Sequence, residues 1–171
     1  MKNLLLVDPS LCTGCRTCEL ACSFFHEKVF SPSFSRVTVV VDYERGYFIP
    51  QMCQQCQDPP CVKSCPTEAI TKNEETGAVE VDYDVCIGCL RCFEACPFGA
   101  IKIRVDNLKP LVCDLCEGDP QCVKFCPREA IKYVPAVKAN LLKKKETLLN
   151  FAKYASQVVE RALPSGGVDE R

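Results

Sequence analysis

The sequence predicts an α+β fold in which two cysteine-rich units are nested one within the other and are followed by a C-terminal helix. Three observations support this prediction. The 171-residue chain contains 16 cysteines, and all of them fall into four compact motifs. Short strand-like runs and polar turns separate the motifs, whereas the segment after the last motif has the periodicity of a helix. The first motif recurs as the third and the second recurs as the fourth, so the chain contains an internal duplication.

The third motif carries the most specific signal. It has the spacing C-x-x-C-x-x-C-x-x-x-C-P, formed by Cys86, Cys89, Cys92, Cys96 and Pro97. This is the spacing of an iron–sulfur ligand set in which the fourth cysteine binds a neighbouring cluster. One such motif therefore predicts a partner motif. The second motif is that partner, with a displaced third cysteine and the same C-P ending, and it comprises Cys53, Cys56, Cys61, Cys65 and Pro66.

The outer motifs repeat the inner ones. The first motif consists of Cys12, Cys15, Cys18 and Cys22, and the fourth of Cys113, Cys116, Cys122, Cys126 and Pro127. Ser23 replaces the proline after Cys22, so the chain is predicted to continue as a helix through CELACSFFHE. Gly14 and Gly88 occupy equivalent places between two ligands, where we expect the missing side chain to let backbone amides approach a cluster; an ordinary turn glycine is the alternative.

Strands and turns are predicted between the motifs. Residues 2–7 form a strand-like run, residues 36–41 and 47–49 a hairpin, and residues 101–105 a further strand. A second hairpin with its turn at residues 73–77 joins the second motif to the third. Apolar residues recur every seven positions over residues 136–163, which predicts a C-terminal helix that packs on the chain's own cluster units or on a partner. Residues 164–171 are predicted to be a disordered tail.

Motif order predicts which cysteines share a cluster, because the first three cysteines of one motif join the last cysteine of its partner. The hairpin between the inner motifs pairs them, so one cluster is held by Cys53, Cys56, Cys61 and Cys96, and a second by Cys65, Cys86, Cys89 and Cys92. The outer motifs pair by elimination, with a third set of Cys12, Cys15, Cys18 and Cys126, and a fourth of Cys22, Cys113, Cys116 and Cys122. Four full sets predict four 4Fe–4S clusters. Residues 51–104 then form an inner unit inserted in an outer unit of residues 1–50 and 105–135.

Composition restricts the class of protein. The chain has few aliphatic residues to form a core. Bonds between ligands and metal are therefore expected to supply folding free energy that apolar burial cannot. The apolar run at residues 4–7 is too short for an export signal, and no segment is long and apolar enough to span a membrane. A cytoplasmic, reducing location is therefore expected, where thiols bind metal, although a subunit exported with a signal-bearing partner would also lack its own signal. A disulfide scaffold and a set of zinc sites fit the spacing less well.

By motif order and spacing over about residues 1–135, the chain resembles the four-cluster ferredoxin-like subunits of molybdenum and tungsten oxidoreductases. The segments CTGCRTCELACSFFHE and CDLCEGDPQCVKFCP are most similar to the small subunit of tungsten aldehyde oxidoreductases. The resemblance implies two nested bacterial two-cluster ferredoxin-like units, a conducting line of clusters, and a pterin site in a separate large catalytic subunit. The chain itself would be a non-catalytic electron-transfer subunit. A flavoprotein subunit, a ferredoxin or a further copy of the chain in end-to-end contact would be its second redox partner.

Other functions compete with this one. A polyferredoxin-type carrier that serves a hydrogenase or a carbon monoxide dehydrogenase has the same cysteine pattern. A catalytic iron–sulfur enzyme would need an open iron site, whereas all four motifs are full. A redox sensor would carry a DNA-binding or effector module, and the acidic charge of bound clusters argues against nucleic acid. His26 is the one histidine, and it is predicted to be a surface or helix-packing residue rather than a residue beside the first cluster.

Overall fold

Short hairpins and short helices make up the part of the chain that the structure describes. The computed structural model describes residues 3–44 and 46–137, and it divides into the units Met1–Val134 and Pro135–Arg171. The predicted helix at residues 136–163 lies outside the described residues except for its first two positions, and the predicted tail at residues 164–171 lies outside them completely. Among the described residues, no helix has the length and apolar character needed to cross a membrane.

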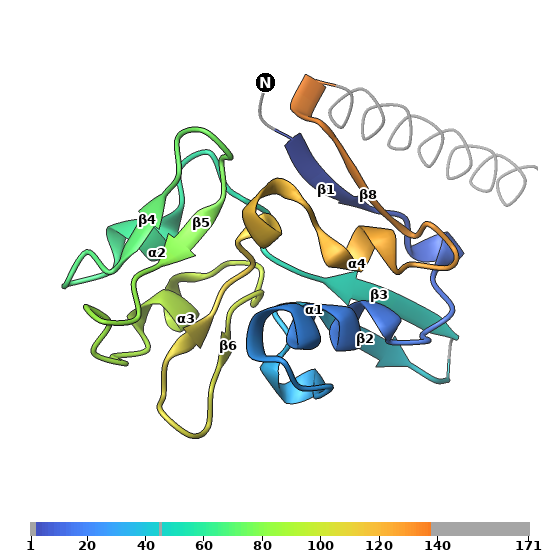
Figure 1. Cartoon of the computed structure of the whole chain (residues 1–171), viewed down its shortest axis with the longest axis horizontal. Helices are drawn as coiled ribbons and strands as arrows, with labels where there is room; N and C mark the ends of the chain where they lie inside the picture. The colour runs from blue at the N-terminus through green and yellow to red at the C-terminus, as the bar shows by residue number, and fades with distance from the viewer. Residues whose placement is uncertain (1–2, 45, 138–171) are drawn as a thin grey trace, which may run out of the picture. The chain divides into compact units, whose positions relative to one another are not determined.

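Short helices and strands alternate along the described chain (Figure 1). The first part of the chain contains β1 (Asn3–Val7), η1 (Pro9–Leu11), α1 (Thr17–Glu27), η2 (Pro32–Phe34), β2 (Thr38–Asp42) and β3 (Tyr47–Gln51). The middle part contains α2 (Pro60–Lys63), β4 (Ile70–Lys72), β5 (Val79–Val81), α3 (Arg91–Ala95) and β6 (Lys102–Ile103). The last part contains β7 (Pro110–Leu111), η3 (Leu115–Gly118), α4 (Gln121–Lys124) and β8 (Ile131–Pro135).

Both predicted hairpins are confirmed. Strands β2 and β3 pair antiparallel with Val40 opposite Ile49, and β4 and β5 pair antiparallel with Thr71 opposite Glu80. The turn of the second hairpin is fixed by Asn73, whose side-chain oxygen accepts hydrogen bonds from the backbone N–H groups of Glu75 and Thr76 at 2.9 and 3.1 Å. An asparagine that bonds its own turn in this way is a common cause of chain reversal.

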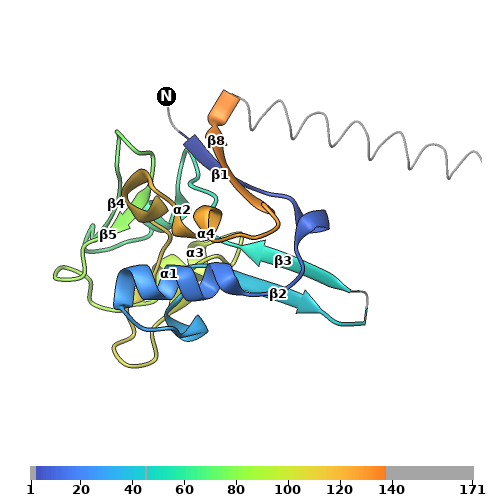
Figure 2. The same cartoon turned by 45° about the vertical axis from the view of Figure 1, so that its right-hand side comes forward.

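Two pairings were not predicted. Strand β6 is shorter than the predicted strand at residues 101–105, because a turn closed by the hydrogen bond from Arg104 N to Lys109 O at 2.9 Å ends it. It pairs with β7, with Lys102 opposite Leu111. Strands β1 and β8 also form a two-stranded sheet, and they lie side by side in Figures 1 and 2. This last pairing brings the start of the chain to the segment that follows the fourth motif.

Helix α1 confirms the prediction made from Ser23. It has 11 residues, whereas the helices that precede the three C-P endings have four or five. Proline disfavours helical geometry in the residue before it, and Cys96 before Pro97 is indeed extended. Serine imposes no such limit. The buried face of α1 consists of Cys18, Glu19, Cys22 and Ser23, so the longer helix directs two cysteines of the first motif into the interior.

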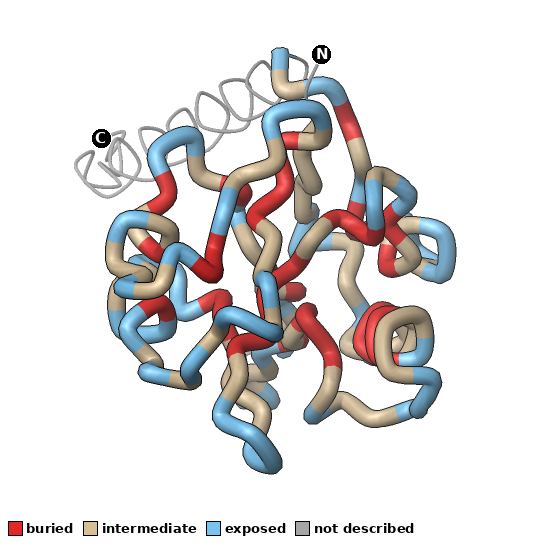
Figure 3. The backbone as a smooth tube through the Cα atoms, turned by 60° about the vertical axis from the view of Figure 1, so that its left-hand side comes forward, coloured by how far each residue is buried: buried red, intermediate tan, exposed pale blue. Residues whose placement is uncertain are grey.

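The buried residues form small clusters that include cysteines, as the burial colouring of Figure 3 illustrates by short red stretches rather than one continuous block. One cluster joins Cys18, Cys22 and Cys122 to Val37, Val39, Met52 and Ile131. A second joins Cys61 and Cys92 to Ile70, Val79, Ile101 and Val112. The described part is therefore a small mixed α and β structure of the ferredoxin-like kind, in which the candidate metal ligands are themselves core residues.

Candidate metal centres

All sixteen cysteines lie among the described residues, and their thiols are free. Their burial differs between motifs. Cys15 and Cys89 are exposed, and the buried cysteines are Cys18, Cys22, Cys61, Cys92, Cys113, Cys116 and Cys122. The two exposed cysteines occupy the same place in the first and third motifs.

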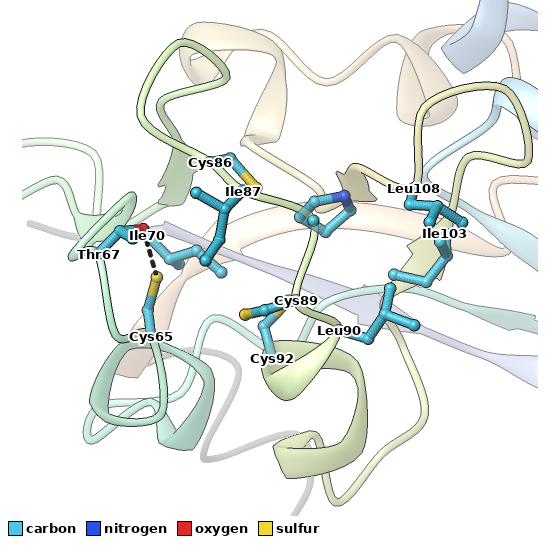
Figure 4. Close-up of a pocket in the computed structure, with 12 residues that line it drawn as sticks. Cys65, Thr67, Ile70, Cys86, Ile87, Cys89, Leu90, Cys92, Ile103 and Leu108 are labelled. Atoms are coloured by element: carbon cyan, nitrogen blue, oxygen red, sulfur yellow. Dashed lines mark hydrogen bonds between the residues drawn. The ribbon is translucent and has the colours of Figure 1, made fainter.

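One pocket is lined by four cysteines from two motifs (Figure 4). Cys65 follows α2, Cys86 and Cys89 lie in the loop after β5, and Cys92 lies in α3. Apolar side chains complete the pocket, including Ile70, Ile87, Ile103 and Leu108. The last cysteine of the second motif thus faces the first three cysteines of the third motif across one hollow.

A second pocket, in the outer part of the chain, has the same pattern of cysteines. Cys12, Cys15 and Cys18 of the first motif line it together with Cys126 of the fourth. Val39, Ala130 and Ile131 are among its apolar neighbours. Both pockets therefore take three cysteines from one motif and one cysteine from another.

The remaining eight cysteines come close enough to repel one another as thiolates. Burial raises the pKa of Cys53 to about 12, and the nearby thiolates of Cys61, Cys56 and Cys96 add to this rise. Burial likewise raises the pKa of Cys122, with a further contribution from Cys22 and Cys116. The pKa of the fully buried Cys113 is raised well above its ordinary value by burial and by Cys122.

The chemistry of these donor sets fits an iron–sulfur group. Burial raises the pKa of Cys18 to about 12 and those of Cys92 and Cys116 to about 11, so the thiols are neutral at pH 7 without a metal. A soft cationic group bound by sulfur would reverse this preference and hold them as thiolates. With such a cluster bound, the site supplies one-electron redox chemistry.

Several cysteine sulfurs accept hydrogen bonds from neighbouring N–H and O–H groups. The Ala130 N–H donates to Cys126 Sγ at 3.3 Å, and the Thr17 hydroxyl donates to Cys15 Sγ at 3.4 Å. Burial raises the pKa of Cys65, but hydrogen bonds with Thr67 outweigh it and the net pKa is lowered. Such donors stabilise the negative charge of a thiolate and are one means by which a protein tunes its cluster.

The structure shows a local requirement for Gly14 and Gly88, while their predicted approach to a cluster stays a prediction. Both have positive φ, +70° and +68°. A Cβ on Gly14 would lie 2.4 Å from Cδ1 of Phe48, and one on Gly88 would lie 3.3 Å from the carbonyl oxygen of Leu108. Glycine is therefore required by backbone geometry and by a neighbouring ring or carbonyl group.

His26 was predicted to be a surface or helix-packing residue, but its side chain also contacts Cys22 of the first motif. Its side chain is 8% exposed. Its Nδ1 lies 2.9 Å from the carbonyl oxygen and 3.9 Å from Sγ of Cys22, and its Nε2 lies 3.0 Å from Oδ1 of Asp114. Burial lowers the pKa of His26, but the hydrogen bonds with Asp114 and Cys22 outweigh it and raise the pKa to about 9. The four-residue spacing from Cys22 on a helix could have indicated the first contact; no local signal indicates the second.

Two further buried polar residues were not predicted. Glu19 is fully buried, and its carboxylate accepts hydrogen bonds from Arg16 Nε and from the Val39 N–H, both at 2.7 Å. Gln55 is 5% exposed. Its side-chain N–H donates to the Cys113 carbonyl oxygen at 2.6 Å, and its side-chain oxygen accepts from the Val79 N–H at 2.8 Å. Gln55 thus connects the second motif to the fourth.

Comparison with known proteins agrees with this geometry. Residues 44–136 match the family described as a 4Fe-4S dicluster domain, and residues 5–24 match a 4Fe-4S binding domain. The polyferredoxin-like subunit of aliphatic sulfonate oxidoreductase from Pyrococcus furiosus is 43% identical over 122 residues, which cover 71% of this chain and 70% of the relative. The B subunit of anaerobic dimethyl sulfoxide reductase from Escherichia coli is 38% identical over 150 residues, covering 75% of this chain and 71% of the relative. Formate hydrogenlyase subunit 2 of E. coli is 32% identical over 188 residues, covering 88% and 91%.

The fold and the cysteine sets define an iron–sulfur protein of the ferredoxin-like class. The chain belongs to the 4Fe–4S dicluster domain family, and it is an iron–sulfur electron-transfer subunit of the kind found in oxidoreductase and hydrogenase-type complexes.

Proposed function

We propose that this chain carries four 4Fe–4S clusters and relays electrons between a large pterin-containing catalytic subunit and a second redox partner. The catalytic partner would be a tungsten or molybdenum enzyme of the aldehyde oxidoreductase type, and the second partner a flavoprotein subunit or a ferredoxin. The chain itself would perform no catalysis. The relative named as a polyferredoxin-like subunit of an oxidoreductase supports this assignment.

The observation that carries the proposal is the crossing of motifs at the two pockets. Each pocket takes three cysteines from one motif and the last cysteine from another, which is the ligand pattern of two-cluster ferredoxins. We assign Cys65, Cys86, Cys89 and Cys92 to one cluster and Cys12, Cys15, Cys18 and Cys126 to another. The mutual repulsion of the remaining thiolates supports the other two sets, which are Cys53, Cys56, Cys61 and Cys96, and Cys22, Cys113, Cys116 and Cys122.

Contacts between sets also suggest a linear order. The thiolate of Cys18 in one outer set contributes to the raised pKa of Cys122 in the other. Cys53 contributes in the same way to Cys113, and Cys61 to Cys92. Each of these three pairs of cysteines also packs within one core cluster, so the members of each pair lie close together. We therefore order the four sets as a line that begins at Cys12, passes through the sets of Cys22 and Cys53, and ends at the set of Cys65.

The two terminal sets are the ones with a surface cysteine, Cys15 at one end and Cys89 at the other. A carrier needs its terminal redox centres near the surface and can bury the internal ones. At the second end, Ile87 and Leu108 beside the pocket are 67% and 53% exposed. We place the exchange of electrons with the two partners at these ends.

The nested division remains part of the proposal. In Figure 1 the hairpin β4–β5 lies with α2 and α3 on one side, and α1, β2, β3 and β8 lie on the other. This arrangement supports an inner ferredoxin-like unit at residues 51–104 within an outer one at residues 1–50 and 105–135. The cytoplasmic location and an end-to-end contact with further copies, made in part by residues 136–163, stay predictions.

Purification of the native complex under anaerobic conditions tests the choice of partner. We expect a large subunit that contains tungsten or molybdenum and a pterin to co-purify with this chain. The relative that is a formate hydrogenlyase subunit favours a second candidate, a carrier for a hydrogenase or a carbon monoxide dehydrogenase. A co-purifying subunit that contains nickel and no pterin would support that candidate and contradict the first.

A further inference from the structure

His26 lies at the junction of the first and fourth motifs and is not used by any ligand set. It belongs to the last turn of α1, four residues after Cys22, so the two side chains share one face of the helix. Asp114 lies 88 positions further along the chain, between the ligands Cys113 and Cys116. The imidazole therefore connects the helix that carries Cys22 to the loop that carries two other ligands of the same proposed set.

The hydrogen-bond geometry fixes the direction in which the ring nitrogens point. Nε2 lies 3.0 and 3.1 Å from the two carboxylate oxygens of Asp114, which accept its hydrogen. Nδ1 faces the carbonyl oxygen of Cys22 at 2.9 Å and its sulfur at 3.9 Å. A carbonyl oxygen can only accept, so Nδ1 carries a hydrogen that points to the backbone and sulfur of Cys22.

Asp114 is itself held in place, which keeps the ring from turning. Its Oδ1 accepts a hydrogen bond from the Cys116 N–H at 3.0 Å. A histidine whose far nitrogen is bound by a carboxylate has a fixed ring orientation, the same device that orients histidines around metals. The Arg36 N–H supplies a second donor to Cys22 Sγ at 3.3 Å. Cys22 thus receives donors from two sides, one of them an anchored side chain.

A separate metal site at these residues is the alternative. The ligand atoms of His26, Asp114 and Cys116 lie within 4.8 Å of one another, close enough to hold an ion. However, each ring nitrogen already faces an oxygen that accepts hydrogen bonds, and Cys116 belongs to a proposed full set of four cysteines. The contacts of the imidazole are therefore those of a hydrogen-bond donor.

We propose that His26 is a positioning residue that donates to Cys22 and thereby raises the reduction potential of the cluster held by Cys22, Cys113, Cys116 and Cys122. An added electron increases the negative charge on a cluster and its sulfurs, and a hydrogen-bond donor stabilises the more negative state. The other three sets receive no histidine, since the sequence contains one. In the proposed linear order this cluster is internal, so its potential affects transfer between the outer and inner units.

The experiment measures the midpoint potentials of all clusters in the complete, cluster-loaded chain by anaerobic redox titration followed by EPR. His26→Leu removes both ring donors, whereas His26→Asn keeps an amide N–H that can reach toward Cys22. Thr17→Val is the matched control on the same helix, because its hydroxyl donates to Cys15 of a different set. We expect His26→Leu to move one potential to a more negative value, His26→Asn to restore it toward the unaltered chain, and Thr17→Val to leave that potential in place.

Unchanged potentials in His26→Leu at full iron content would overturn the inference. Loss of iron from one cluster in both His26 variants would also overturn it, because the histidine would then maintain the fold instead of setting a potential. The inference rests on the proposed assignment of Cys22 to a cluster, and the iron content of the unaltered chain tests that assignment separately. A full iron complement combined with unmoved potentials removes the role of His26 and leaves the four-cluster proposal intact.

Discussion

At the scale of single residues, the thiols determine how metal loading responds to pH. Burial raises the pKa of Cys18 and Cys53 to about 12, above the ordinary value of 9.0. Between about pH 9 and pH 12 the metal-free fold therefore binds more protons than the unfolded chain. Its free energy of unfolding falls as the pH rises above about 9. Metal loading responds in the opposite direction, because each bound sulfur must first release its proton.

We therefore predict that the metal-free chain binds Co²⁺ more tightly as the pH rises from about 6 to about 8, by about tenfold per pH unit for each proton released. Titration with Co²⁺ at each pH, followed by the thiolate-to-Co²⁺ absorption, measures the affinity, and an indicator dye in weak buffer counts the released protons. An affinity that does not change with pH would show that the thiols are already ionised in the metal-free fold.

Gly14 gives a second prediction at this scale. An alanine there would meet both the strain of φ +70° and the ring of Phe48, so Gly14→Ala should lower the stability of the loaded protein by about 2 to 4 kcal/mol. Gly46→Ala is the control, because Gly46 has φ +69° with nothing within 4 Å of the added Cβ. Thermal unfolding should separate the two variants. Equal losses would mean that the Phe48 ring moves aside without cost.

At the scale of elements, helix α1 depends on the absence of a proline after Cys22. Ser23 is buried, and its hydroxyl accepts from the Ser31 N–H at 3.1 Å. A proline at this position would remove a helical hydrogen bond and clash with the preceding turn, at a cost of about 3 kcal/mol or more. The helix would then end before His26 and Glu27, and the orientation of Cys22 would change.

Ser23→Pro is therefore expected to lower both thermal stability and iron content, whereas Ser23→Ala should cost only about 1 kcal/mol and retain its iron. Circular dichroism on heating and iron analysis of each purified variant measure these two effects. A proline variant with full iron content and an unchanged melting temperature would show that the first motif binds its cluster without the full length of α1.

The elements differ in how much of their structure local sequence determines. Local signals were sufficient where the cause is local: the Asn73 turn, the β2–β3 hairpin and the helix that continues past Ser23 were all predicted. The pairing of β1 with β8 and of β6 with β7 depends on contacts between distant segments, which no short pattern encodes. The same limit applies to the site. The spacing of the cysteines identified them as candidate metal ligands. The roles of Gln55, Glu19 and His26 depend on side-chain contacts with distant segments, which no local pattern predicts.

At the scale of the whole described molecule, Gln55 joins the middle of the chain to its last part. Its amide satisfies two backbone groups, the Cys113 carbonyl and the Val79 N–H. Gln55→Leu would leave both groups buried without a partner, which should cost about 2 to 4 kcal/mol. Gln54→Leu is the control, since Gln54 is exposed and its side-chain N–H donates to the nearby Met52 carbonyl oxygen at 3.0 Å. Denaturant unfolding of the loaded protein measures the difference, and similar stability in both variants would contradict the connecting role of Gln55.

In the proposed assignment, four full sets of cysteines, crossed between motifs, hold four 4Fe–4S clusters. The most direct test is the iron and acid-labile sulfide content of anaerobically purified protein, normalised to the protein concentration by amino-acid analysis. Four 4Fe–4S clusters predict about 16 iron and about 16 sulfide per chain. A reproducible value near about 8 of each would mean that two of the four sets hold no cluster, and it would contradict the account.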